Sequence, residues 1–140
     1  MKTDFQNFIL DARIAILSMT VPRKEAIQRV RALADNLVLH LALIVSYPDN
    51  QEQKHWRKEV ANFANQIGLS AKRSAVRLPD DLLLKLVYEE PIGTDKDKLA
   101  ILQWMQRKMN GKAPDVDLFA ETDFEALIKA TLKSPLSIYA

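Results

Sequence analysis

The amino-acid sequence predicts an all-α fold, an irregular bundle of five to seven helices in a single domain that covers residues 1–140. Apolar residues recur at spacings of three and four along most of the chain, which is the period of a helix with one buried face. The chain holds only 3 glycines, and each stands where a helix is expected to end. A length of 140 residues suits one domain with its own hydrophobic core.

The first two helices are expected on either side of Pro22. The first should run over about residues 4–19, with Thr3 and Gln6 as its capping box. Pro22 suits the first turn of a second helix, which should continue to about Ser46. The apolar stripe of the first helix comprises Phe5, Phe8, Ile9, Ala12, Ile16 and Met19.

Residues 37–45, LVLHLALIV, are apolar on all sides apart from His40. This segment is either the central, fully covered part of a long helix or a buried strand. The helical stripe of the preceding residues runs into it without a turn signal, which favours a central apolar helix. Pro48, Asp49 and Asn50 then end the element in either case.

Helices three and four are expected on either side of a short basic segment. The third should span about residues 51–67 and end at Gly68, a natural left-handed cap. The fourth should begin at Pro79, carry Asp80 and Asp81 in its first turn, and stop before Pro91.

Two further helices are expected near the C-terminus. Thr94 and Asp97 are typical of a helix start, and the helix behind them should end at Gly111. Residues 114–120 are expected to form a loop. Thr122 and Glu125 then read as a capping box for the last helix, which Pro135 should stop.

The composition excludes several classes of function. The chain has no cysteine, so disulfides and thiolate metal sites are ruled out, and this composition fits a reducing, cytoplasmic compartment. Asp4, Asp11 and Arg13 interrupt the apolar residues at the N-terminus, unlike the uncharged core of a signal peptide. The longest apolar stretch is too short to span a bilayer, so no membrane partner is expected.

Basic residues gather between Lys54 and Arg77 and form the candidate nucleic-acid-binding group. The chain carries +5 through Leu78 and −3 after it, which also suits head-to-tail self-association. A basic stripe can neutralise phosphates, but a solvated helix face whose Trp56 is simply core is the simpler interpretation. The group consists of Lys54, Arg57, Lys58, Lys72, Arg73 and Arg77.

An apolar tail follows Pro135 and is the candidate interface: Leu136, Ile138 and Tyr139. Such a tail either folds back onto its own chain or docks on another subunit. His40 could be a ligand or a base, but a core histidine with a hydrogen-bond partner is the simpler interpretation. Asp115 and Asp117 resemble a fragment of a calcium loop without its glycine and terminal glutamate. No catalytic residue, metal site or cofactor is predicted.

The run LVLHLALIVSYPDNQEQKHWRKEVANFANQI, residues 37–67, has an apolar helix with a histidine, a short polar loop, and a Trp-Arg pair opening the next helix. His40, Trp56 and Arg57 occupy those places. This pattern resembles the central signature of the bacterial all-helical domain-of-unknown-function family twenty-nine. The resemblance implies an all-helical bacterial fold and supplies no activity.

Three functions remain open on these observations. The first is a non-enzymatic protein-interaction or regulatory module that self-associates as a homo-oligomer. The second is a nucleic-acid-binding regulator that uses the basic segment 54–77. The third is a helical enzyme built around His40, which would need a polar pocket beside that residue.

Overall fold

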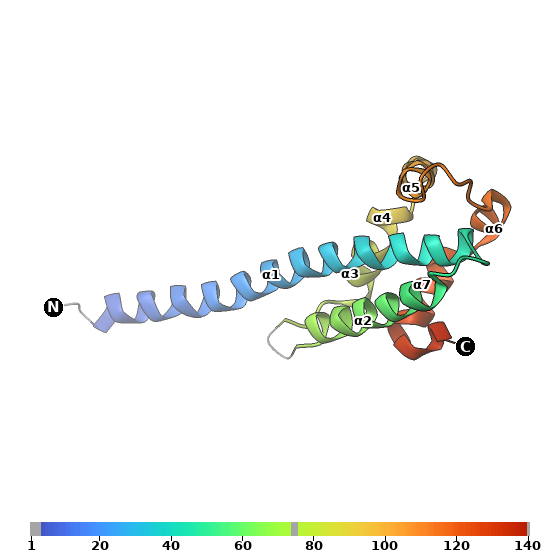
Figure 1. Ribbon diagram of the computed structural model, residues 1–140. Coiled ribbons are helices and arrows are strands. Elements are labelled where there is room, and N and C mark those ends of the chain that lie inside the picture. Colours follow the sequence, from blue (N-terminus) through green and yellow to red (C-terminus); the bar gives the residue numbers. More distant parts are fainter. Residues whose placement is uncertain (1–3, 74–75, 140) are drawn as a thin grey trace.

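The chain is built around a long N-terminal helix, α1, that spans Asp4–Ser46. The structure is a computed structural model that describes the backbone of residues 4–73 and 76–139 and the side chains of residues 22–73 and 76–139. Helix α2, Gln53–Ala71, follows after a short turn and runs back antiparallel along the second half of α1 (Figure 1). This helix pair forms the base on which the remaining elements pack.

The elements after α2 are short helical pieces that cover the α1–α2 pair (Figure 1). Throughout residues 4–73 and 76–139 all regular structure is helical, which confirms the all-α prediction. The pieces are α3 (Asp80–Leu84), the π-helical turn η1 (Lys85–Glu89), α4 (Glu90–Ile92), α5 (Asp95–Lys108), α6 (Val116–Glu121), α7 (Phe124–Lys133) and the 3-10 helix η2 (Pro135–Tyr139).

The central apolar segment is helical and lies at the middle of the core. Leu37, Leu41 and Leu43 are fully buried within α1, and Ile44 is 7% exposed. Side chains on every face of this helix are covered because α2, η1, α4, α5 and α6 all contact α1. The expected central helix is therefore confirmed, and the strand alternative is wrong.

The sequence suggested that Pro22 separates two helices. In the structure, Pro22 instead lies inside the continuous helix α1. A proline removes one donor from the helical hydrogen-bond ladder, yet it need not end a helix whose neighbours favour the helical state on both sides. The expected cap at Thr3 lies outside the described residues.

Gly68 likewise stands inside a helix, because α2 continues to Ala71. Ile67, Ser70 and Ala71 are all buried. Continued packing of this face therefore outweighs the weak helical preference of one glycine. The Gly68 carbonyl oxygen accepts the N–H of Lys72 at 3.0 Å, so the cap falls four residues later than predicted.

The fourth predicted helix passes through Pro91 rather than stopping before it. At the π-helical turn, Glu90 donates its N–H to the carbonyl oxygen of Lys85, five residues back. The wider turn shifts the hydrogen-bond pattern just ahead of a residue that has no N–H of its own. The helix reaches Ile92, which is fully buried.

Side-chain caps set the later helix starts. Thr94 Oγ1 accepts the N–H of Asp97 at 3.1 Å, as predicted. The predicted box at Thr122 and Glu125 is wrong, because Asp123 Oδ1 accepts the N–H of Ala126 at 3.0 Å and caps α7 itself. The neighbouring aspartate is the stronger competitor, and Thr122 instead donates to the Leu118 carbonyl oxygen at 2.6 Å.

The segment expected as a loop over 114–120 contains helix α6. Asp115 Oδ1 accepts the N–H of Leu118 at 3.0 Å, and Phe119 is 3% exposed and packs on Phe124. Asp115 is thus a helix cap, which accounts for the acidic residue at this place without a calcium loop.

Candidate functional site

The first turns of α2 hold three of the predicted basic residues, but only two of them face solvent freely. Lys54 and Lys58 are exposed. Arg57 is half-buried and donates an N–H from Nη1 to the backbone carbonyl oxygen of Ile138. This bond ties the guanidinium group to the C-terminal tail, so Arg57 is engaged within its own chain.

Lys72, Arg73 and Arg77 lie at the opposite end of α2 and just beyond it, and all three are exposed. Eighteen residues of helix separate Lys54 from Lys72, a rise of roughly 27 Å. The structure therefore divides the six predicted residues into two groups rather than placing them on one patch.

The predicted interface tail folds back onto α2 as the 3-10 helix η2. Ile138 is buried in the chain's own core, with 7% of its surface exposed. Leu136 and Tyr139 remain accessible, at 73% and 50% exposure. Two of the three candidate residues are thus placed where another protein could contact them.

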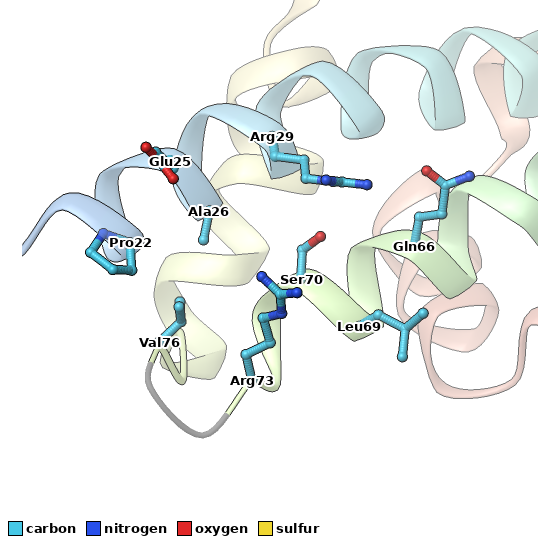
Figure 2. A pocket seen from close by; sticks show the side chains of 9 residues that line it. All are labelled: Pro22, Glu25, Ala26, Arg29, Gln66, Leu69, Ser70, Arg73 and Val76. Atoms are coloured by element: carbon cyan, nitrogen blue, oxygen red, sulfur yellow. The ribbon is translucent and has the colours of Figure 1, made fainter. Parts of the chain in front are cut away.

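A cavity of about 280 Å³ opens between the middle of α1 and the end of α2. Arg29 of α1 and Arg73, just beyond α2, reach it from two sides, and Ser70 lies between them (Figure 2). Pro22, Ala26, Leu69 and Val76 give the cavity an apolar part, while Glu25 and Gln66 complete its lining. Two cations and a hydroxyl group therefore face one hollow.

The polar groups of this cavity are not satisfied by one another. Within the described residues, no carboxylate lies within 4.0 Å of the guanidinium group of Arg29 or Arg73, although Glu25 stands four residues before Arg29. Ser70 is 8% exposed, and its hydroxyl group makes no hydrogen bond with any described group. Because Ser70 lines the cavity, its hydroxyl group can bond to water or to a ligand there.

A second charged cluster joins α1 to α4. Arg31 donates from Nε and Nη2 to the two carboxylate oxygens of Glu90 at 3.0 and 3.1 Å. The hydrogen bond from Arg31 lowers the pKa of Glu90. Partial burial, and then the nearby charge of Glu90, raise the pKa of Asp35. The ion pair links α4 to α1 at their rim. Because both partners are exposed, it contributes little to stability.

His40 has a structural role in this arrangement. Its Nδ1 lies 2.7 Å from the carbonyl oxygen of Asn36, one turn earlier in α1, and its ring packs on Phe63 with the centroids 5.4 Å apart. In the part of the chain that the structure describes, no group of three histidine or acidic side chains is placed to hold a metal ion. Nor does any helix of that part have the length and apolarity needed to cross a membrane.

Sequence reasoning missed Arg29 as a partner of Arg73. The two residues are far apart in the chain, and Arg29 lies outside the basic segment 54–77, among other basic residues near the middle of α1. Arg29 and Arg73 come close to one cavity because α2 turns back along α1, and no periodic pattern in the sequence predicts this arrangement.

No protein-family model matches the chain, and no curated protein or solved structure is similar to it. The resemblance of residues 37–67 to the all-helical family therefore stays a prediction. Any assignment of function has to come from the geometry of this chain.

Proposed function

We propose that this protein is a non-enzymatic interaction module that self-associates through the first half of α1. One observation carries the proposal: α1 continues well past the end of α2 and of the other helices, as a single extended element (Figure 1). A lone helix gains little stability in water from its own hydrogen bonds, so a helix of this kind is normally stabilised by packing one face against a partner.

The sequence of that first half supplies a face suited to a partner. Phe5, Phe8, Ala12, Ile16 and Met19 recur with the helical period. Burying such a stripe against another helix is worth on the order of 1.5–3 kcal/mol for each large apolar side chain that is fully covered. An apolar stripe this long favours association over a solvated helix.

The spacing of the stripe favours a second copy of this chain as the partner. All stripe positions but Ile9 are symmetric about residue 12, since residues 5 and 19, and residues 8 and 16, lie at equal distances from it. Ile9 would stand opposite the smaller Ala15. Two copies crossing antiparallel at Ala12 would set Phe5 opposite Met19 and Phe8 opposite Ile16. A two-fold axis requires this kind of self-complementary surface.

Size-exclusion chromatography with light scattering tests the proposal on the full chain. We expect a dimer of the 15.9 kDa chain that Phe8→Glu converts to a monomer. A monomer at about 100 µM, where even a micromolar dimer would form, would defeat the proposal.

Leu136→Asp is the matched control, because it places a charge on the exposed tail instead. If Leu136→Asp dissociates the dimer while Phe8→Glu does not, then the interface is the tail and the α1 proposal fails. Circular dichroism of each variant shows whether the bundle is still folded.

Nucleic-acid binding remains the second candidate, favoured by the exposed cations Lys72, Arg73 and Arg77 near Arg29. Such binding depends on phosphate contacts and therefore weakens steeply as salt is raised. A duplex oligonucleotide added in the same chromatography should then shift the protein at low salt and release it at high salt. Charge reversal of Lys72 and Arg77 should abolish the shift.

A further inference from the structure

We infer that the cavity between Arg29 and Arg73 is a binding site for a small molecule that carries a phosphate group. The lining residues of this site all lie beyond the apolar stripe of residues 5–19, so the inference does not depend on self-association. It rests on three observations at one place: a hollow of about 280 Å³, two guanidinium groups that face it, and the hydroxyl group of Ser70 between them.

The two arginines provide the charge and the donors for an anion. Arg29 reaches the hollow from α1 and Arg73 from the end of α2, so their N–H groups approach from different directions (Figure 2). Neither is neutralised by a carboxylate of the described residues. Guanidinium groups in this state bind oxyanions strongly, because each N–H···O bond is assisted by charge.

Ser70 adds a hydroxyl group to the hollow. It lies between the two arginines in Figure 2, and no described group accepts from it or donates to it. The hydroxyl group can therefore exchange a bound water for an oxygen atom of a ligand. Gln66 gives one amide hydrogen to Asn62 Oδ1, at 3.1 Å, and keeps a second hydrogen for a ligand.

The donors favour phosphate over carboxylate. A phosphate monoester presents three terminal oxygens in a tetrahedral arrangement, which suits donors that arrive from α1, α2 and the floor, whereas a carboxylate offers two oxygens in one plane. Ala26, Leu69 and Val76 add an apolar side that suits a small organic group on the ester. The volume of about 280 Å³ is close to the lower end for small-molecule sites.

Glu25 is the one unfavourable group, because its carboxylate lines the same cavity. It should repel a dianion, so the affinity of the wild-type site is limited by this residue. The position of Glu25 also supplies a test with the opposite sign from every arginine variant.

The experiment follows backbone amide signals by NMR while inorganic phosphate or phenyl phosphate is added to the full chain. We expect saturable shifts centred on residues 66–73, with phenyl phosphate bound more tightly because of the apolar side. Arg29→Gln and Arg73→Gln should each weaken binding by about tenfold, and Ser70→Ala by about threefold. Glu25→Gln should tighten it.

Arg23→Gln is the matched control, since Arg23 is an exposed arginine of the same helix that does not line the cavity. It should leave the affinity within about twofold. Equal weakening by Arg23→Gln and Arg29→Gln would mean general charge attraction and would overturn the inference. So would the absence of saturable shifts at about 20 mM phosphate, including a case in which only a duplex oligonucleotide produces them.

Discussion

Arg57, near the start of α2, donates a hydrogen bond to the backbone carbonyl oxygen of Ile138, 81 residues further along the chain. Ile138 itself is buried, so the bond closes the C-terminal 3-10 helix over the face of α2. A basic residue that the sequence offered as a phosphate contact thus holds the tail in place. Substitution of Arg57 should therefore lower the stability of the fold rather than act only on the binding of a ligand.

Arg57→Ala should lower the free energy of unfolding by about 1–2 kcal/mol, because a charged donor is lost and a partly buried carbonyl oxygen is left without its partner. Urea denaturation followed by circular dichroism measures the change. Lys58→Ala is the control, since Lys58 is the exposed neighbour and makes no hydrogen bond with described residues. Equal losses in the two variants would show that the bond to Ile138 contributes nothing.

Much of the fold follows from local pattern. The stripe through Leu37 and Leu41 predicts the central helix, and Thr94 with Asp97 predicts a helix start that forms as expected. Helix ends are harder to predict, because Pro22 lies inside the continuous helix α1 and packing of the α2 face overrides the weak stop signal of Gly68. Asp123 caps α7 in place of Thr122, because both neighbouring side chains can accept an N–H of the first turn.

The candidate site could be predicted only in part. Arg73 was identified from charge alone, while Arg29 and Ser70 join it only through the antiparallel pairing of α1 and α2. The engagement of Arg57 within its own chain could not be predicted for the same reason. Ile138, whose carbonyl oxygen accepts its hydrogen bond, lies near the other end of the chain. Contacts between residues this far apart leave no periodic trace in the sequence.

Two glycines should respond to alanine with opposite signs. A Cβ atom at Gly93 would lie 2.5 Å from the carbonyl oxygen of Glu89, so Gly93→Ala forces the backbone to move and should cost about 1–3 kcal/mol. Gly68 is inside α2 with nothing within 4 Å of such an atom. Gly68→Ala should therefore stabilise the protein by up to about 1 kcal/mol. Thermal unfolding of both variants measures the pair, and a shift in the same direction would contradict the geometry.

The Arg31–Glu90 pair should make stability depend on pH in the acid range. The pKa of Glu90 is lowered in the folded state from an ordinary value of 4.5. Its contribution is therefore fully present above pH 4.5 and is lost as the pH falls through the lowered pKa. Because the pair is exposed, Glu90→Gln should cost only about 0.5 kcal/mol at pH 7 and nothing at strongly acid pH. Urea denaturation at both pH values checks this, with Glu89→Gln as the control.

Asp35 should behave in the opposite way, since burial and the charge of Glu90 raise its pKa above 3.8. Its ionised form is disfavoured in the folded state, so it destabilises the protein at neutral pH and ceases to do so once it is protonated in both states, below pH 3.8. Asp35→Asn should stabilise the protein by about 0.5 kcal/mol at pH 7 and lose that gain in acid. A gain that does not change with pH would point to helix propensity instead of charge.

Gln53 closes the end of the central helix and gives the last prediction. Its Nε2 donates to the carbonyl oxygens of Ile44 and Tyr47, each at 2.8 Å. The Ile44 oxygen belongs to the last turn of α1, whose carbonyl groups lack helical partners, whereas the Tyr47 oxygen also accepts the N–H of Asn50 at 3.1 Å. Gln53→Leu should cost about 1–3 kcal/mol in the free energy of unfolding, chiefly because the part-buried Ile44 carbonyl oxygen loses its donor.

Gln53→Glu separates hydrogen bonding from size in the same urea experiment. The side chain keeps its shape, but an ionised carboxylate cannot donate and its charge opposes the negative end of the α1 dipole. Gln53→Glu should therefore destabilise at least as much as Gln53→Leu at pH 7 and recover part of the loss when the carboxyl group is protonated. Gln51→Leu, at an exposed position of the same turn, should change little. If Gln53→Glu is neutral at pH 7, the amide is not what holds the end of α1.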